Sequence, residues 1–332
     1  MKIGLWADNV NFPSLPMMKL SAYHKNLGDE TKLITAPDEH FDLAYISKTF
    51  NLPGVRKIPT LGFTPNADVI HYGGSGTAIT VIDGKEVYTQ GKDTPLPHEV
   101  EHIYPDYGLY SELTRDTAFG FLSRGCPNNC GFCIVTSREG CKSVRVAELS
   151  EFWRGQRNIK LMDANLLACR DQDLLIHSLI SSGAQIDYTQ GLDARFIDEH
   201  TAQLLCRTNI KMVHLAFDLM KFEREIVCGL EIFRRHFQKS DRSCQVYILT
   251  NYNTTHAEDW YRVRRVIELG YQPDVRIYRK GTHDRFLTDL SRWANAHALY
   301  RSSSFEDYVP RKDGKRCSEL YGNIIGNGVK QF

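Results

Sequence analysis

The feature that most constrains the fold of this chain is a regular alternation of short apolar segments with helical patterns, beginning near residue 117. Short apolar runs are typical of strands buried in a parallel sheet, and apolar residues at helical spacing predict the helices that cover it. Six strand–helix units in series therefore predict a parallel α/β fold with right-handed connections. The expected strands are 119–122, 159–162, 185–188, 212–217, 246–249 and 275–278, and the expected helices are 146–157, 171–181, 198–207, 221–237, 256–269 and 284–298.

The first hundred residues predict a smaller, Rossmann-like α/β domain. The pattern favours strands at 2–7, 31–35, 41–46 and 67–72, a helix over 13–28, and a hairpin across 79–88 that turns at Asp83-Gly84. Three prolines in 90–110 are typical of a linker. We therefore expect a first domain at 1–100, a linker at 101–116, the repeating domain at 117–300 and a C-terminal extension at 301–332.

Three cysteines lie in one short loop directly after the first strand of the repeating domain, at Cys126, Cys130 and Cys133. Thiolates are natural ligands of iron–sulfur clusters and zinc. The proline, asparagines and glycine between them favour tight turns. The C-x3-C-x2-C spacing has no fourth cysteine in step, so a four-iron cluster held there keeps one iron open for another ligand. Active sites of parallel α/β folds lie at the carboxyl ends of strands, where this loop begins.

The cysteine spacing, the aromatic Phe132 before the last cysteine and the apolar stretch ahead of the loop resemble the radical SAM superfamily. The resemblance implies a partial (β/α)6 barrel, with an ordinary doubly wound sheet as the alternative. It also implies that Cys126, Cys130 and Cys133 hold a [4Fe-4S] cluster whose free iron chelates S-adenosylmethionine. In that superfamily the reduced cluster cleaves S-adenosylmethionine to a 5′-deoxyadenosyl radical, which abstracts a hydrogen atom.

A structural zinc site is the other interpretation of the cysteine loop, with Cys141 as a fourth ligand. Zinc ligands usually come as C-x2-C pairs, and only Cys130 and Cys133 meet that rule. The spacing therefore favours the iron–sulfur cluster.

Polar residues follow five of the expected strands, where they would converge on a ligand at the carboxyl edge of the sheet. These segments resemble the corresponding parts of the radical SAM subgroup with a cobalamin-binding-like domain ahead of the barrel. The guanidinium of Arg195 suits the ligand's carboxylate, and the other predicted S-adenosylmethionine contacts are Asp163, Asn165, Gln190 and Asn251. The five segments are 163–165, 190–195, 217–218, 250–254 and 278–279.

Each of these polar residues also has a structural interpretation. Asp163 is placed to cap the helix that follows it, and Asp218 is placed to do the same before Lys221. Arg195 has Asp193 and Asp198 within reach as surface ion-pair partners, which contribute little stability. The glycine-rich run 73–77 lacks the full spacing of a phosphate loop, so we interpret it as a plain connection.

We expect the first domain to resemble a cobalamin-binding module in fold only. That family ligates cobalt through the histidine of Asp-x-His-x-x-Gly. Here His24 has no aspartate two residues before it, and Gly28 comes one residue late. His24 also falls inside a helical pattern, so we expect a surface histidine and no cobalamin.

Composition is that of a globular protein, with 42% hydrophobic and 24% charged residues and a formal net charge of +1 over 332 residues. There is no long apolar run for a membrane span and no leader pattern, since Asp8 interrupts the start. We therefore expect a cytoplasmic protein. Its cysteines outside the loop are then small buried residues of a reducing compartment: Cys141, Cys169, Cys206, Cys228, Cys244 and Cys317.

The sequence thus predicts a radical SAM enzyme supplied with electrons by a donor such as flavodoxin or ferredoxin. The alternative is a non-catalytic iron–sulfur or zinc protein with a binding role on nucleic acid. In support of the alternative, Arg262, Arg264 and Arg265 share one predicted helix, with Trp260 and Trp293 nearby in sequence. The substrate, whether a small molecule, a peptide or RNA, and the reaction type are not encoded in any motif that we recognise.

Overall fold

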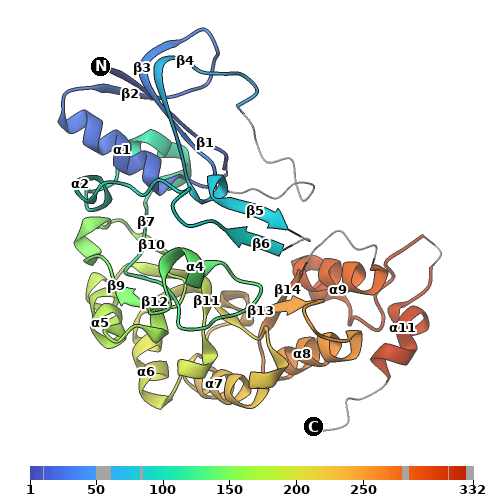
Figure 1. Ribbon diagram of the computed structural model, residues 1–332. Coiled ribbons are helices and arrows are strands. Elements are labelled where there is room, and N and C mark those ends of the chain that lie inside the picture. Colours follow the sequence, from blue (N-terminus) through green and yellow to red (C-terminus); the bar gives the residue numbers. More distant parts are fainter. Residues whose placement is uncertain (10, 50–60, 83–84, 279–283, 313, 327–332) are drawn as a thin grey trace. The chain divides into compact units, whose positions relative to one another are not determined.

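The computed structural model describes the chain except residues 10, 50–60, 83–84, 279–283, 313 and 327–332 (Figure 1). Contacts divide it into two compact units, Met1–Asp163 and Ala164–Phe332. Both units contain parallel strands and helices, which confirms the predicted α/β class. The domain boundaries proposed from the sequence stay predictions.

The first unit begins with a four-stranded parallel sheet in the order β2-β1-β3-β4. Helix α1 (Leu15–Asn26) packs on one face, where Leu5 of β1 meets Met17 and Leu20. Ala44 and Ile46 belong to a second apolar cluster, whereas Leu43 and Tyr45 pack against the first. Successive strand residues point to opposite faces, so one short sheet serves two cores. The strands are β1 (Lys2–Ala7), β2 (Glu30–Leu33), β3 (His40–Ser47) and β4 (Asn66–Gly73).

The predicted hairpin is present as β5 (Ile79–Ile82) and β6 (Lys85–Tyr88), which pair antiparallel. Its turn, Asp83-Gly84, lies outside the described residues. Short helical elements that the prolines did not suggest lie at and within the predicted linker 101–116: α2 (His98–Glu101) at its start, and the 3-10 turn η2 (Tyr107–Tyr110) and α3 (Ser111–Thr114) inside it.

The first unit also contains the strands on either side of the cysteine loop. Strand β7 (Thr117–Gly120) pairs in parallel with β10 (Asn158–Leu161). Strands β8 (Ser123–Arg124) and β9 (Val144–Arg145) pair antiparallel and close the loop, which contains the short helix α4 (Val135–Glu139).

The predicted helix 146–157 is wrong, because only the 3-10 turn η3 (Leu149–Glu151) forms there. The backbone N–H of Val146 donates to Leu122 O, outside any helix. Gly155 ends the segment with φ +98°, and the indole of Trp153 bonds Gln156 O. These contacts prevent a continuous helix over 146–157.

The second unit carries four parallel strands paired in chain order. The four expected helices that accompany them, and the one that precedes them, are all present. The last, predicted as 284–298, is broken at Ala296, where the side chain of Asn295 bonds both backbone groups of Val275. The elements are α5 (Gln172–Ser182), β11 (Gln185–Leu192), α6 (Glu199–Arg207), β12 (Asn209–Ala216), α7 (Glu223–His236), β13 (Cys244–Thr250), α8 (His256–Glu268), β14 (Gln272–Ile277), α9 (Arg285–Asn295), α10 (His297–Ser302) and α11 (Cys317–Ile325).

The two faces of this second sheet differ in polarity. Val213, Leu215 and Val246 are fully buried on one face. On the other, the rings of His214 and Tyr247 stack with centroids 4.8 Å apart. In the described part of the chain, no helix combines the length and apolar character needed to cross a bilayer.

Candidate functional site

The entrance of the cysteine loop is built around Gly125, which directly precedes Cys126. Gly125 has φ +86°, and a Cβ placed there would lie 2.1 Å from Lys142 O. Only glycine fits such a close approach in a left-handed conformation. The backbone N–H of Cys126 then donates to Gly140 O at 3.2 Å. The two ends of the loop are therefore held together independently of any metal.

The three thiols lie at or near the surface of this loop: Cys126 and Cys130 are partly buried and Cys133 is exposed. The backbone N–H of Val135 donates to Cys133 Sγ at 3.5 Å. The hydroxyl of Thr136 lies 3.4 Å from Cys126 O and 3.2 Å from Asn128 O, and so ties helix α4 to the turn.

This donor set fits an iron–sulfur cluster. Thiolates hold such clusters, and N–H groups directed at sulfur tune them. Among the described residues, no three His, Cys, Asp or Glu side chains are grouped to hold a metal ion. In a cluster each thiolate binds a different iron, so its ligands need not converge on one point. The assignment of Cys126, Cys130 and Cys133 as ligands stays a prediction.

The remaining cysteines differ from the expectation that all are buried. Cys169, Cys244 and Cys317 are buried, Cys206 is partly buried, and Cys141 and Cys228 are exposed. Cys141 follows Gly140 on the side of the loop that returns to β9.

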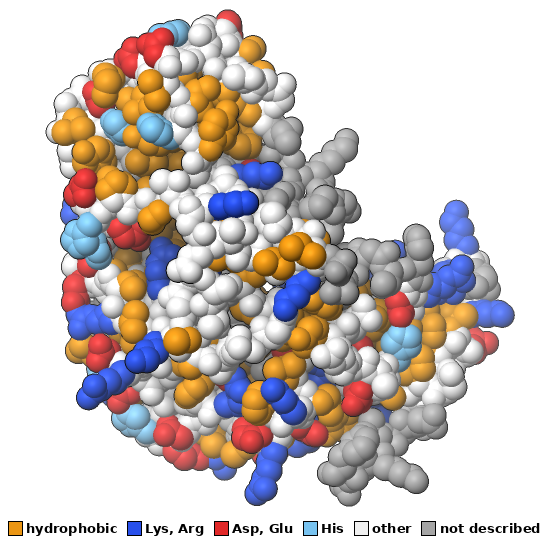
Figure 2. All heavy atoms as spheres, in the orientation of Figure 1, with side chains coloured by type: hydrophobic (Ala, Val, Ile, Leu, Met, Phe, Trp, Pro, Cys, Tyr) orange, Lys and Arg blue, Asp and Glu red, His pale blue; other side chains and the backbone are white. Residues whose placement is uncertain are grey.

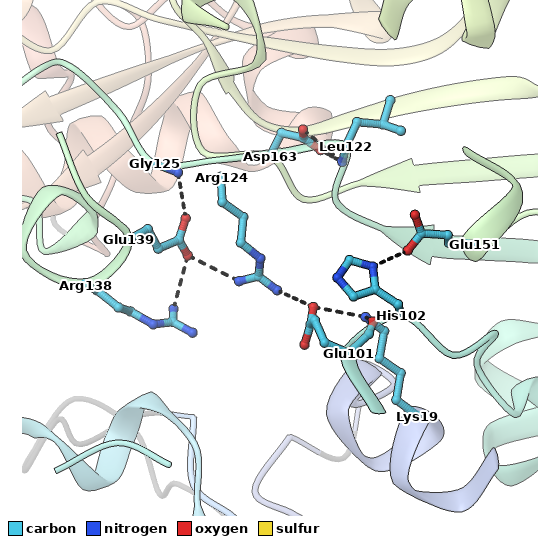
Figure 3. Close-up of polar contacts among 10 residues, drawn as sticks. All are labelled: Lys19, Glu101, His102, Leu122, Arg124, Gly125, Arg138, Glu139, Glu151 and Asp163. Atoms are coloured by element: carbon cyan, nitrogen blue, oxygen red, sulfur yellow. Dashed lines mark hydrogen bonds and ion pairs between the residues drawn. The ribbon is translucent and has the colours of Figure 1, made fainter. Parts of the chain in front are cut away.

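A row of ion pairs leads away from the cysteine loop (Figure 3). Glu139, the last residue of α4, accepts the N–H of Gly125 at 3.2 Å and pairs with Arg124 at 3.6 Å. Arg124 reaches Glu101 at 3.4 Å, and Glu101 pairs with Lys19 of α1 at 3.0 Å. Burial lowers the pKa of Lys19, an effect that the charge of Glu101 opposes.

Asp163 braces the backbone that leads into the loop. Its carboxylate accepts the N–H of Leu122 at 3.1 Å and both the N–H and the hydroxyl of Ser123, at 2.5 and 2.7 Å. Burial raises the pKa of Asp163 to about 6, although these hydrogen bonds lower it. The carboxylate thus links the end of β10 to the segment after β7, whatever ligand it contacts.

Arg195 and Asn165 are brought together in the second unit by Asp193. The guanidinium of Arg195 binds both Asp193 oxygens, through Nε at 2.8 Å and Nη2 at 2.7 Å. Its plane lies over the ring of Phe222 at 4.3 Å. Asn165 Nδ2 lies 3.4 Å from Asp193 Oδ2. The ion pair with Asp193, one of the two interpretations of Arg195, is therefore formed, and it is partly buried rather than on the surface.

The other two predicted contacts have different surroundings. Gln190 is exposed on β11. Asn251 adopts φ +63°, donates its side-chain N–H to Tyr278 O at 3.0 Å and donates its backbone N–H to Asp259 Oδ2 at 3.2 Å. Asp218 is not a helix cap, because its Oδ1 accepts the N–H of Leu249. Arg279 lies outside the described residues.

A buried ion pair that was not predicted from the sequence organises these strand ends. Arg262 and Asp259 of α8 are both 0% exposed and lie 2.5 Å apart. Arg262 also donates to the carbonyls of Phe217, Asp218 and Leu249. The signal was present in the sequence: opposite charges three residues apart occupy the apolar face of a predicted helix, which indicates a buried pair.

Two other sequence interpretations are corrected. The proposed basic, aromatic face does not exist as such, because Arg262, Trp260 and Trp293 are buried. His24 is not a surface histidine, because it is 4% exposed. Its Nδ1 lies 2.8 Å from Asp29 Oδ2 and its Nε2 lies 3.1 Å from the Tyr45 hydroxyl.

The fold can be compared with known proteins. A solved structure that it resembles is that of TsrM from Kitasatospora setae, a radical S-adenosylmethionine methyltransferase with cobalamin and a [4Fe-4S] cluster bound. The TM-score is 0.58 at 11% sequence identity, over 83% of this chain and 72% of that one. This chain therefore shares the fold of that radical SAM methyltransferase, which agrees with the resemblance predicted from the sequence. Comparisons with protein-family models and with curated proteins found no match.

Proposed function

We propose that this chain is a radical SAM enzyme, in which Cys126, Cys130 and Cys133 hold a [4Fe-4S] cluster. When bound and reduced, the cluster supplies the electron that cleaves S-adenosylmethionine to the hydrogen-abstracting 5′-deoxyadenosyl radical. The observation that carries this proposal is the C-x3-C-x2-C loop, whose entrance conformation at Gly125 only glycine can adopt. The loop follows strand β7 in a fold that resembles a radical SAM methyltransferase. The protein's own role is to bind, orient and exclude water.

Five residues are proposed to bind S-adenosylmethionine: Asp163, Asn165, Gln190, Arg195 and Asn251. A guanidinium has five N–H donors, so the two bonds from Arg195 to Asp193 are compatible with a second carboxylate. Asp193 and the Phe222 ring orient the guanidinium before the ligand arrives, which lowers the entropy cost of binding.

The cluster is tested by anaerobic reconstitution with iron and sulfide. We expect a brown protein with about four irons per chain, because a single [4Fe-4S] cluster carries that number. Replacing Cys126, Cys130 or Cys133 by alanine should abolish the colour, and the exposed Cys141→Ala is the matched control. Loss of colour in the Cys141 variant would indicate a four-cysteine site instead.

The enzymatic proposal is separated from its alternative by one assay. Reduced protein incubated with S-adenosylmethionine should form 5′-deoxyadenosine. A non-catalytic iron–sulfur or zinc protein, with a binding role on nucleic acid, should form none. The electron donor proposed for this reaction is a flavodoxin or ferredoxin.

Ligand binding is tested at Arg195. Losing a charge-assisted hydrogen-bonded pair costs about 1.5–3 kcal/mol, so Arg195→Ala should weaken S-adenosylmethionine binding by roughly one to two powers of ten. Arg195→Lys should recover only part, because an ammonium cannot form the fork. Iron content should stay unchanged. The exposed Arg235, which pairs with Glu199, gives the matched control Arg235→Ala.

We propose no cobalamin for this chain, although the structure of TsrM contains it. Both ring nitrogens of His24 are engaged within a buried contact, so no free histidine ligand is offered there. Equilibrium dialysis with hydroxocobalamin decides the matter, and stoichiometric binding would overturn this part of the proposal.

The substrate is proposed to lie over the polar face of the second sheet. There the Nδ1 of His214 is 2.9 Å from Tyr188 O, and the Tyr247 hydroxyl donates to Thr189 O at 3.0 Å. Rings fixed in this way offer a flat, partly polar surface. Small molecules, peptides and RNA that co-purify with the protein are the first compounds to test.

A further inference from the structure

The carboxylate of Glu139 lies at the C-terminal end of helix α4, where the helix itself does not stabilise a negative charge. A carboxylate at the last residue of a helix faces the negative end of the helix dipole, which is unfavourable. Yet the Glu139 side chain is only 10% exposed. It turns back to the loop entrance, where Oε2 accepts the N–H of Gly125 at 3.2 Å. Oε1 lies 3.6 Å from Arg124 and 3.8 Å from Arg138.

This contact acts at the point where the loop has least freedom. Two backbone oxygens confine Gly125. A Cβ on Gly125 would lie 2.1 Å from Lys142 O and 3.2 Å from Glu139 O. Cys126, the next residue, bonds Gly140 O. A partly buried N–H that loses its acceptor costs free energy, so the conformation of Gly125 depends on the Glu139 carboxylate.

Arg124 connects this carboxylate to the rest of the first unit (Figure 3). Its guanidinium lies 4.0 Å from the centre of the Phe121 ring and bridges Glu139 to Glu101. Glu101 in turn binds Lys19, which is 8% exposed. Positive and negative charges therefore alternate from Glu139 through Arg124 and Glu101 to Lys19. A small cavity of about 20 Å³ is lined in part by Lys19 and Glu101.

We propose that Glu139 is a positioning residue that holds the cysteine loop in its cluster-binding conformation before the cluster is present. Arg124 is the bridge that fixes the Glu139 carboxylate relative to Glu101 and Lys19. The inference rests on the proposed function, since it concerns the loop that holds the cluster. It adds a residue outside the cysteine motif whose loss impairs cluster assembly.

The experiment compares Glu139→Ala and Glu139→Gln with wild type. The matched control is Glu112→Ala, since Glu112 is 89% exposed and pairs only loosely with Arg115 at 3.7 Å. Three quantities are measured: amide hydrogen exchange at Gly125 and Cys126 in the iron-free protein, irons per chain after reconstitution, and the rate of iron loss to a chelator.

We expect exchange at Gly125 and Cys126 to be roughly ten- to a hundredfold faster in Glu139→Ala, as the loss of one charge-assisted hydrogen bond predicts. Iron loss should be faster by a similar factor. Glu139→Gln keeps an acceptor for the N–H of Gly125 but not the charge. Its rates of exchange and iron loss should therefore lie between those of wild type and Glu139→Ala. Arg124→Gln should accelerate exchange, and its effect should shrink in the Glu139→Gln background, because the two residues act as a pair.

Wild-type exchange and iron loss in Glu139→Ala would overturn the inference. If Glu139→Ala unfolds, the test uses Glu139→Gln, Arg124→Gln and the double variant instead. Additive effects of the two substitutions on exchange would then overturn the inference. Failure of the proposed function is distinguishable, because the wild-type protein itself would then not take up four irons, whereas exchange in the iron-free protein would still report on Glu139.

Discussion

The pKa values of two aspartates, Asp163 and Asp218, are raised well above the usual range of a carboxyl group. Burial raises the pKa of Asp163 to about 6 and that of Asp218 to about 6. Both accept backbone N–H groups at the ends of strands. These hydrogen bonds and, for Asp218, the charge of Arg262 offset only part of the desolvation cost.

Asp163 makes stability depend on pH in a predictable direction. Its pKa in the folded chain, about 6, lies above the ordinary value of 3.8. The unfolded chain therefore ionises first, and stability is lost as pH rises from about 4 to 6. Relative to Asp163→Asn, the wild-type free energy of unfolding should fall by about 3 kcal/mol over that range. Urea unfolding of both full-length proteins at pH 4, 5, 6 and 7 measures this difference.

The comparison with the variant separates Asp163 from Asp218, which titrates in the same window in both proteins. A difference that is independent of pH would mean that Asp163 is solvated or has an ordinary pKa in the folded chain. The amide that Asp163→Asn introduces keeps one acceptor oxygen for Ser123, so the variant is expected to fold.

The Arg262–Asp259 pair should be the most sensitive point of the second unit. Removing one partner of a buried ion pair leaves an unpaired buried charge and typically costs about 3–5 kcal/mol. We therefore expect Arg262→Met to lower the free energy of unfolding by that amount in denaturant titrations. Arg264→Met on the same helix, where Arg264 is 42% exposed and 3.9 Å from Glu268, should change it by less than about 0.5 kcal/mol. Equal effects of the two variants would contradict this expectation.

At the scale of elements, helix α7 packs closely against the turn η5 (Ala194–Phe196), which carries Arg195. The close contact is made at Gly229. A Cβ on Gly229 would lie 1.8 Å from Ala194 O. Alanine normally stabilises a helix interior by about 1 kcal/mol over glycine. Here we expect Gly229→Ala to lower the melting temperature, since α7 must move away from η5, and to weaken S-adenosylmethionine binding.

Gly322 provides the matched control for this prediction. It lies in α11, and a Cβ placed there meets no atom within 4 Å. Gly322→Ala should leave binding unchanged and raise the stability by up to about 1 kcal/mol. Similar effects of the two substitutions on melting temperature and binding would mean that the contact between α7 and η5 tolerates a methyl group.

Elements with long, unbroken periodicity were predicted from the sequence. Helix α8 and strand β13 follow directly from their apolar spacing, because burial of one face decides their structure. The helix expected at 146–157 failed because β-pairing at Val144–Arg145 runs up to its start and Val146 donates its N–H to Leu122 O, which are contacts between distant segments. Local pattern does not contain such contacts.

For the candidate site, the cysteine loop was predictable from the sequence but the side chains that support it were not. The cysteine spacing gave the loop, because ligand spacing is local. Glu139 could not be recognised, since its partner Gly125 lies fourteen residues earlier and meets it only after the loop closes. The pairing of Arg195 with Asp193 was one of the stated interpretations, and the sequence alone could not choose between it and ligand binding.

At the scale of the whole molecule, basic and acidic side chains nearly balance, at 41 and 40. On the face drawn in Figure 2 the two signs are interspersed. A net charge so close to zero gives little electrostatic repulsion between copies at neutral pH. Exposed strands then matter more for solubility, and β4 is an edge strand of its sheet.

We expect a single lysine on β4 to improve solubility. Val69 is 50% exposed on this strand, and a charge on an edge strand opposes pairing with another copy. Val69→Lys should raise the protein concentration at which light scattering appears, while changing the free energy of unfolding by less than about 0.5 kcal/mol. Leu27→Lys adds the same charge at a 62% exposed position outside any strand, so it should help less. Equal improvement would point to net charge alone.

The position of β4 at the edge of its sheet also bears on how the protein is stored and handled. Among the described residues β4 pairs only with β3, and Tyr72 on this strand is 61% exposed, so another extended segment could pair with the outer side of β4 without unfolding of the described sheet. Losses of this protein in solution should then depend on concentration at temperatures well below its melting point. Dilution, rather than a stabilising additive, is the remedy that this strand suggests.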